Sequence, residues 1–305
     1  MITLRGLTKR YGDTLAVDGL DLSVRPGRVT GFLGPNGAGK TTTLRMVLGL
    51  DHPTSGEALV DGRPYRELRR PLHTVGAVLD AGALHPGRTA HSHLLALARS
   101  HGIPASRVDE VLGTVGLSGV ARRRAGGLSL GMGQRLGIAA ALIGDPALLI
   151  LDEPVNGLDP DGVRWFRGLV RSLADEGRTV LLSSHLMSEM QLTADHLVVI
   201  GRGRLITDAP LARVLENSAW TAVRVRAPHP EDLVGALEAE GARVERPAAN
   251  ELVVTGVPIE RVGELAHRAG VALHELTARA ATLEQAYHEL TADSVQHRAL
   301  DRSRT

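Results

Sequence analysis

Short apolar runs alternate with segments of helical periodicity through most of the chain. Residues 147–151 form a continuously apolar run, which is typical of a strand buried on both faces of a parallel sheet. A second short run at 29–33, which includes β-branched residues, precedes a glycine-rich segment, and residues 42–48 then open a helix. This alternation of strands and helices predicts an α/β core.

The pattern changes after residues 196–206, which predict a hairpin that closes the first domain. Residues 210–216 predict a connecting helix. In the strand expected at 219–226, Val223 and Val225 alternate with arginines, as in a half-buried strand. The elements expected beyond it are a helix at 231–240, strands near 242–245 and 251–255, a helix at 259–269 and a strand at 271–277. Their β-α-β-β-α-β order predicts a small ferredoxin-like α+β domain.

We therefore divide the chain into a first domain over residues 1–215, an accessory domain over 216–291 and a polar tail over 292–305 that is expected to be disordered. A helical subdomain is expected within the first domain at 83–140, and a last helix at 283–290. The accessory domain contains no glycine loop, acid pair or metal-ligand spacing. We expect it to be a regulatory or dimer-contact module, with a passive stabilising appendage as the alternative.

Composition limits the classes of function. Hydrophobic residues make up 43% of the 305 residues, which suits a globular core, and a net charge of +1 gives no support to a general role in binding nucleic acid. The lack of cysteine excludes disulfides and cysteine-ligated metals. No uninterrupted apolar run of about 18 residues occurs, and the first residues lack the apolar core of a signal peptide. Another polypeptide would therefore have to supply any membrane span.

The candidate chemistry begins with the glycine-rich segment between the strand at 29–33 and the helix at 42–48. It fits the phosphate-loop pattern G-x-x-x-x-G-K-[ST] in the required strand–loop–helix context. Its residues are Gly34, Pro35, Asn36, Gly37, Ala38, Gly39, Lys40 and Thr41, and Thr42 follows them. Such a loop wraps a phosphate with backbone N–H groups. Lys40 would reach the β- and γ-phosphates, and the Thr41 hydroxyl group would ligate Mg²⁺. Because lysine is rare in this chain, the expected number of chance matches to G-x-x-x-x-G-K, before the final Ser or Thr is required, is only roughly 0.03.

Two acids follow the apolar run at 147–151. Asp152, at the carboxyl end of this strand, is placed to hold Mg²⁺ through water. Glu153 is placed to polarise the attacking water as a general base. An acidic turn without chemistry is the alternative, and the pairing with a phosphate loop favours nucleotide hydrolysis.

Residues 128–135 read Leu-Ser-Leu-Gly-Met-Gly-Gln-Arg and lead into a helical pattern. This segment resembles the signature motif of the nucleotide-binding subunits of ABC transporters, in the form associated with drug and antibiotic-resistance exporters of the daunorubicin type. Ser129 and Gly131 match the signature L-S-G-G-Q, whereas Leu130 and Met132 replace its first glycine and its glutamine. The resemblance implies that Ser129 and Gly131 face the γ-phosphate held by a second copy of the subunit. A plain helix N-cap is the alternative reading of Ser129.

The resemblance continues in order over residues 1–215. It implies that Asp159 lies at the dimer contact, that His185 contacts the γ-phosphate and helps to orient the attacking water, and that Tyr11 stacks on adenine. One position departs from the family, because Asp80 stands where a glutamine usually contacts Mg²⁺. We expect Asp80 to act as a substitute, since a carboxylate also ligates Mg²⁺.

The resemblance implies a P-loop NTPase core of the ABC ATPase type that hydrolyses ATP with Mg²⁺. Two subunits would form a homodimer on binding ATP, beneath a separate permease at the cytoplasmic face of the membrane. They would power export of a drug, antibiotic or lipid-like cargo that no residue of this chain identifies. The main alternative is a soluble ABC-type ATPase of DNA repair or translation, although such proteins tend to carry coiled coils, zinc fingers or two cassettes. A non-catalytic ATP-binding regulator is a further alternative, against which Glu153 and His185 argue.

Overall fold

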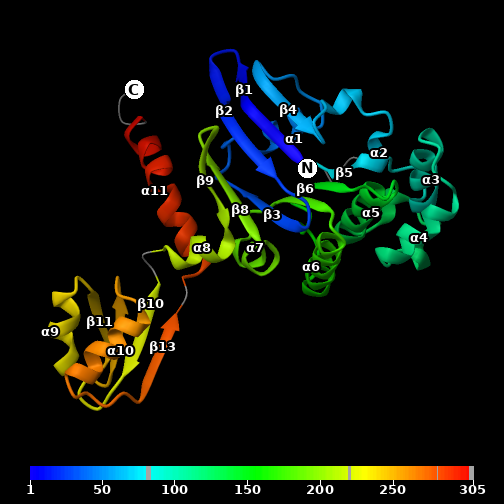
Figure 1. Cartoon of the computed structure of the whole chain (residues 1–305). Helices are drawn as coiled ribbons and strands as arrows, with labels where there is room; N and C mark the ends of the chain where they lie inside the picture. Colours follow the sequence, from blue (N-terminus) through cyan, green and yellow to red (C-terminus); the bar gives the residue numbers. More distant parts are fainter. Residues whose placement is uncertain (80–83, 219–220, 280, 302–305) are drawn as a thin grey trace. The chain divides into compact units, whose positions relative to one another are not determined.

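The chain folds into two compact units, Met1–Ala209 and Pro210–Thr305 (Figure 1). The structure, a computed structural model, describes residues 1–79, 84–218, 221–279 and 281–301. All the predicted site residues belong to the first unit.

The first unit is built on a six-stranded sheet in the order β5-β6-β7-β3-β8-β9. Its strands are β3 (Arg28–Leu33), β5 (Val75–Val78), β6 (Leu148–Asp152), β7 (Thr179–Ser183), β8 (His196–Gly201) and β9 (Arg204–Pro210). Neighbouring strands from β5 through β8 pair in parallel. Every residue of β7 and β8 is buried. The α/β core predicted from the apolar runs is thereby confirmed.

A smaller antiparallel sheet shares its core with the first helix, α1 (Lys40–Val47). Its order is β2-β1-β4, and its strands are β1 (Ile2–Tyr11), β2 (Thr14–Val24) and β4 (Ser55–Val60). Leu7 on β1, Leu44 on α1 and Ile150 on β6 belong to one buried apolar cluster. This cluster fixes α1, and with it the helix end that carries Lys40, against the central sheet.

The first unit contains six further α-helices and three short 3-10 turns among its described residues. They are α2 (Pro71–Thr74), α3 (Ala90–Ser100), α4 (Ser106–Thr114), α5 (Leu130–Leu142), α6 (Pro160–Asp175) and α7 (Met187–Thr193), with 3-10 turns at Tyr65–Glu67, Ser118–Val120 and Ala125–Gly127. Helices α3, α4 and α5 pack on one another and form the helical subdomain at one end of the unit (Figure 1). Helix α5 also lies directly on β5, where a Cβ atom on Gly76 would stand 2.1 Å from the backbone oxygen of Ala141.

The second unit contains one four-stranded antiparallel sheet in the order β11-β12-β10-β13. Its elements are α8 (Leu211–Glu216), β10 (Ala222–Arg226), α9 (Glu231–Ala239), β11 (Arg243–Ala248), β12 (Glu251–Thr255), α10 (Ile259–Arg268), β13 (Glu275–Arg279) and α11 (Leu283–Asp301). Between β10 and β13 they follow the predicted β-α-β-β-α-β order. Val225, Leu237, Leu252 and Val262 form part of the core between this sheet and helices α9 and α10.

Several boundaries differ from the prediction, and residues 219 and 220 of the strand expected at 219–226 lie outside the described residues. Three of the differences have a clear physical reason. Strand β13 begins at Glu275 rather than near Val271, because its partner β10 ends opposite Glu275, at Arg226. Helix α11 continues through Asp301 into the tail that is predicted to be disordered. Residues 291–301 include no glycine or proline that would end a helix. The units divide after Ala209, ahead of the predicted boundary, because α8 packs against α11.

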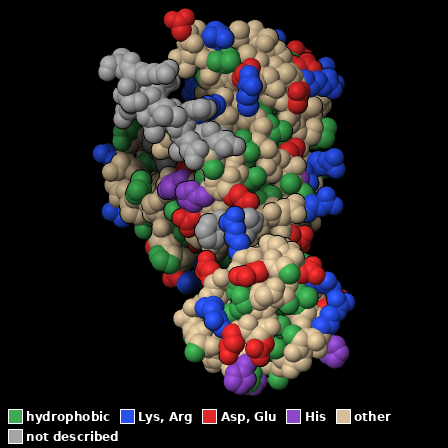
Figure 2. Space-filling view, turned by 90° about the vertical axis from the view of Figure 1, so that its left-hand side faces the viewer, with side chains coloured by type: hydrophobic (Ala, Val, Ile, Leu, Met, Phe, Trp, Pro, Cys, Tyr) green, Lys and Arg blue, Asp and Glu red, His purple; other side chains and the backbone are tan. Residues whose placement is uncertain are grey.

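Charges of both signs are spread over the face of the molecule that Figure 2 shows. Figure 2 shows Lys and Arg side chains interspersed with Asp and Glu on the visible face of each unit. This agrees with the net charge of +1. The visible face presents no large basic area. A large basic area is the feature that nucleic-acid binding proteins typically show.

Candidate functional site

The glycine loop joins β3 to α1, as the sequence predicts, and its glycines occupy positions that a side chain would strain or block. Gly37 and Gly39 have φ angles of 78° and 100°, in the left-handed region that favours glycine. A Cβ atom on Gly39 would lie 2.4 Å from the backbone oxygen of Ala16, and one on Gly34 would lie 2.5 Å from that of Ile200. The glycines of the motif are therefore required by the fold of the loop.

Lys40 begins α1 and turns its side chain back onto this loop. Its Nζ donates to the backbone oxygen of Gly34 at 2.5 Å and to that of Pro35 at 3.3 Å. Burial lowers the pKa of the Lys40 ammonium group, and the nearby carboxylates of Glu153 and Asp152 oppose that shift. A partly buried cation thus lies at the loop, with two acids beside it.

Asp152 ends β6 beside the N-terminus of α1. The Thr41 hydroxyl group donates to Asp152 Oδ2 at 2.9 Å, so two of the three predicted Mg²⁺ ligands are in contact. Oxygen donors of this kind suit Mg²⁺, which usually takes one or two protein ligands together with water and phosphate oxygens. Among the described residues, no group of three or more His, Cys, Asp or Glu side chains could hold a metal. Thr41 and Asp152 supply the one or two protein oxygens that Mg²⁺ usually takes.

Glu153 and His185 meet across the ends of β6 and β7. His185 Nδ1 lies 2.7 Å from Glu153 Oε2, and the His185 backbone N–H donates to the same oxygen at 3.3 Å. Glu153 has a φ angle of 52°, a conformation that costs a non-glycine residue about 1–3 kcal/mol and is often found at functional sites. The predicted base, Glu153, and the histidine predicted to contact the γ-phosphate, His185, are thus in direct contact.

The signature residues form a second, separate group. Ser129 caps α5 and accepts a hydrogen bond from the backbone N–H of Met132 at 3.3 Å. Asp159 caps α6 in the same way, accepting from Gly162 at 2.7 Å. A Cβ atom on Gly131 would lie 2.8 Å from the backbone oxygen of Gly157, so the two segments are closely packed. Within one chain, Ser129 acts as the plain N-cap that the alternative reading describes.

Comparison with known proteins decides the family. The family described as "ABC transporter" matches residues 17–156. The chain is 44% identical over 213 residues to the bacitracin transport ATP-binding protein BcrA of Bacillus licheniformis, covering 69% of this chain and 70% of that protein. The chain belongs to the ATP-binding subunits of ABC transporters.

Two further ABC proteins extend the comparison. The Nod factor export ATP-binding protein I of Burkholderia orbicola is 37% identical over 302 residues, covering 97% of this chain and 98% of that protein. A dimeric ATP-binding cassette, solved in a post-hydrolysis state with ADP and phosphate, has a TM-score of 0.63 at 26% identity, covering 69% of this chain and 99% of its own. A domain family of unknown function, DUF8746, matches residues 221–284. The predicted ABC ATPase fold and class of activity are confirmed.

The side chain of Tyr11, which is predicted to stack on adenine, is held by Asp51, a residue with no role in the sequence prediction. Its hydroxyl group donates to Asp51 Oδ2 at 3.0 Å, and Arg45 Nε donates to the same oxygen at 2.8 Å. Burial raises the pKa of the Tyr11 hydroxyl group, and the hydrogen bond to Asp51 adds to the effect. The Tyr11 side chain nevertheless stays 47% exposed. No local motif marks Asp51, because it lies 40 residues from Tyr11.

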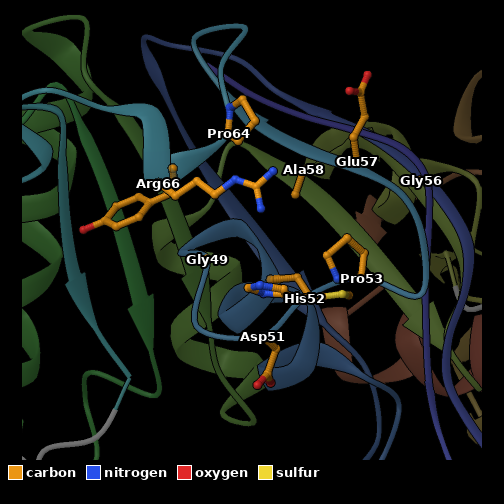
Figure 3. Close-up of a pocket in the computed structure, with 11 residues that line it drawn as sticks. Gly49, Asp51, His52, Pro53, Gly56, Glu57, Ala58, Pro64 and Arg66 are labelled. Carbon is orange, nitrogen blue, oxygen red and sulfur yellow. The ribbon is translucent and has the colours of Figure 1, made fainter.

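Asp51 also lines a cavity of about 340 Å³ between the end of α1 and strand β4. Figure 3 shows Asp51 and Glu57 on opposite sides of this cavity, with His52 and Pro53 between them. None of its lining residues belongs to the glycine loop or to the acid pair. The cavity is therefore distinct from the phosphate-binding part of the site.

Two more residues that sequence reasoning misses touch the ABC acid pair. Ser183, the last residue of β7, forms hydrogen bonds with both Asp152 and Glu153. Gln134 on α5 donates from Nε2 to the backbone oxygen of Glu153 at 3.4 Å.

Asp80, the predicted glutamine substitute, lies outside the described residues. Among the described residues, no helix is both long and apolar enough to cross a membrane.

Proposed function

We propose that this chain is the ATP-hydrolysing subunit of an ABC exporter and works as a pair beneath a separate membrane permease. Two contacts carry the proposal, and both lie where β6 and β7 end beside the glycine loop. Thr41 contacts Asp152, and these two groups suit Mg²⁺. Glu153, the proposed base, contacts His185, which is proposed to contact the γ-phosphate.

The residues take roles that follow from their positions. Lys40 would exchange its two backbone acceptors for the β- and γ-phosphate oxygens, which are stronger acceptors. Thr41 and Asp152 would hold Mg²⁺, which when bound neutralises charge on the phosphates. Glu153 would accept a proton from the attacking water, and His185 would hold the Glu153 carboxylate in place and contact the γ-phosphate. Tyr11 would stack on the adenine ring.

A second copy of the chain would complete each site. Ser129 and Gly131 lie at the N-terminus of α5, where free backbone N–H groups favour an anion. The resemblance to the family implies that this anion is the γ-phosphate held by the second copy. The dimeric state of the related cassette supports this arrangement.

Relatives support an export role. BcrA is a bacitracin transport protein, and the Burkholderia relative is a Nod factor export protein that aligns with nearly the whole chain. We propose a drug, antibiotic or lipid-like cargo carried by the permease, with this subunit at the cytoplasmic face of the membrane. The rival role in DNA repair or translation is less well supported, since the visible face carries mixed charges (Figure 2).

The substitution Glu153→Gln tests the proposed function. It removes the base but keeps the size of the side chain, so ATP turnover should fall by at least about a hundredfold. ATP-bound pairs should accumulate, which size-exclusion chromatography with light scattering would detect. Glu176→Gln is the matched control, because Glu176 pairs with Arg178 and lies outside the proposed site. If Glu153→Gln hydrolysed ATP as fast as this control, Glu153 would not be the base.

A further inference from the structure

Ser183 lies where the central sheet meets the acid pair. In the parallel pairing of β6 with β7, Ser183 is the register partner of Asp152, so the two side chains project from the same face of the sheet. This is also the face on which Ile150 and Leu181 pack in the core with α1. Ser183 is fully buried, with 0% of its surface exposed.

The Ser183 hydroxyl group joins two acids with different roles. It donates a short hydrogen bond to Asp152 Oδ1, while Thr41 donates to the other oxygen, Oδ2. Two hydroxyl groups therefore hold the Asp152 carboxylate from both sides. The same Ser183 oxygen accepts a hydrogen bond from the Glu153 backbone N–H at 3.1 Å.

The backbone of Glu153 needs such support. Its φ angle of 52° lies in the left-handed region, where a residue with a Cβ atom remains only if its surroundings hold it. The Glu153 N–H also approaches the Ser183 backbone oxygen at 3.2 Å, and the Glu153 carbonyl accepts from Asn156 at 3.2 Å and from Gln134. Among the contacts described, the Ser183 side chain is the one that reaches Asp152 as well.

We propose that Ser183 is a positioning residue whose hydroxyl group locks the carboxylate of Asp152 and the backbone of Glu153 into one arrangement. The Mg²⁺-holding group and the proton-accepting group then keep a fixed separation. This inference rests on the proposed roles of Asp152 and Glu153. It adds a residue that the glycine loop, the acid pair and the signature motif do not include.

Three variants of the full chain test the proposal. Ser183→Ala and Ser183→Cys remove the strong hydroxyl donor, and the cysteine variant leaves no cavity in case the alanine variant does not fold. Ser183→Thr retains a hydroxyl group at the same position. Turnover should fall by about tenfold to a hundredfold in the first two, as is usual when a partner of a metal ligand is lost, and the threonine variant should recover most of it.

Two readouts separate positioning from a general loss of structure. The Mg²⁺ concentration that gives half-maximal turnover should rise by several-fold in Ser183→Ala and Ser183→Cys. Hydrogen exchange of the backbone amides of Glu153, Val155 and Asn156, measured without nucleotide, should become faster in both variants. Exchange elsewhere in the central sheet should be unchanged.

Thr30→Val is the matched control. Thr30 is equally buried and lies on the neighbouring strand β3, but its hydroxyl oxygen has no hydrogen-bond partner in the described part of the chain. Loss of this hydroxyl group should leave turnover, Mg²⁺ dependence and exchange as in the unmodified chain.

Two results would overturn the inference. One is turnover and Mg²⁺ dependence within about twofold of the unmodified chain in Ser183→Ala or Ser183→Cys. The other is a loss in Ser183→Thr as large as in Ser183→Ala, which would mean that shape rather than the hydroxyl group matters. Glu153→Gln measured alongside distinguishes the two levels of the proposal. If Glu153→Gln stays active, the assigned roles of the acids fail; if it is inactive while Ser183→Ala is active, only the role of Ser183 fails.

Discussion

At the residue scale, recognition of the nucleotide base would depend on how firmly Tyr11 is held. Its hydroxyl group is fixed by Asp51, which Arg45 also contacts, and Lys9 Nζ lies 4.8 Å from the centre of the tyrosine ring. The hydrogen bond from Arg45 is the main reason that the pKa of Asp51 is lowered. Asp51 therefore stays ionised near neutral pH and remains a strong acceptor for the tyrosine.

Removing the ring of Tyr11 should weaken ATP binding. Stacking of a base on an aromatic side chain contributes about 1–3 kcal/mol, so Tyr11→Ala should raise the dissociation constant by about tenfold or more. Tyr11→Phe is the control: it keeps the ring and loses only the bond to Asp51, so the loss should be smaller. Isothermal titration with ATP measures both. Equal affinity of Tyr11→Ala and the unmodified chain would exclude stacking.

At the element scale, glycine decides how closely helices approach the sheet. Gly76 on β5 faces α5 so directly that any side chain would meet the backbone of Ala141. Gly168 on the exposed side of α6 has no atom of another segment within 4 Å of an added Cβ. The same residue type is thus required by packing at one position and only lowers helix stability at the other.

These two glycines predict opposite effects on stability. Gly76→Ala should lower the free energy of unfolding by about 1–3 kcal/mol, as is usual for overpacking. Gly168→Ala should raise it by about 0.4–1 kcal/mol, because alanine restricts the unfolded chain and favours the helix. Chemical denaturation followed by circular dichroism measures both changes. A stable Gly76→Ala variant would show that α5 can move away from β5 at little cost.

At the scale of the whole molecule, the second unit has its own core and its own network of charges. Glu251 on β12 is buried and accepts hydrogen bonds from Arg224 at 2.8 and 2.7 Å and from Arg226 at 3.0 Å. The hydrogen bonds from Arg224 are the main cause of a lowered pKa for Glu251. This network lies on the sheet face opposite the core that α9 and α10 cover.

The charge network predicts a pH-dependent stability of the second unit. The pKa of Glu251 is lower in the folded than in the unfolded state, so its contribution is full above about pH 4.5 and is lost as the pH falls through the folded-state pKa. Glu251→Gln should therefore lower the unfolding temperature of the second unit by several degrees at neutral pH. The difference should shrink as the pH falls below about 4.

Differential scanning calorimetry of the full chain tests this prediction. The transition of the first unit should keep its midpoint in Glu251→Gln, because that unit has a separate core. If both transitions moved together, the two units would unfold as one cooperative body. If the deficit were the same at every pH, the charge of Glu251 would not be its cause.

The sequence alone determined the elements whose information is local. The glycine loop, the apolar run of β6 and the signature segment are each contiguous, and their conformations follow from glycine backbone freedom, burial on both faces and helix capping. The order of elements in the second unit is likewise readable from periodicity. The start of β13 was not, because its pairing with β10 sets it.

Only the tertiary structure decided which distant groups meet. Asp152 and Ser183 are 31 residues apart, Glu153 and His185 are 32 apart, and Tyr11 and Asp51 are 40 apart. Strand register and the packing of α1 bring these pairs within hydrogen-bond distance. No local sequence pattern specifies either of them. A serine at the end of a buried strand looks like any other in the sequence. Its contact with two acids appears only when β6 and β7 lie side by side.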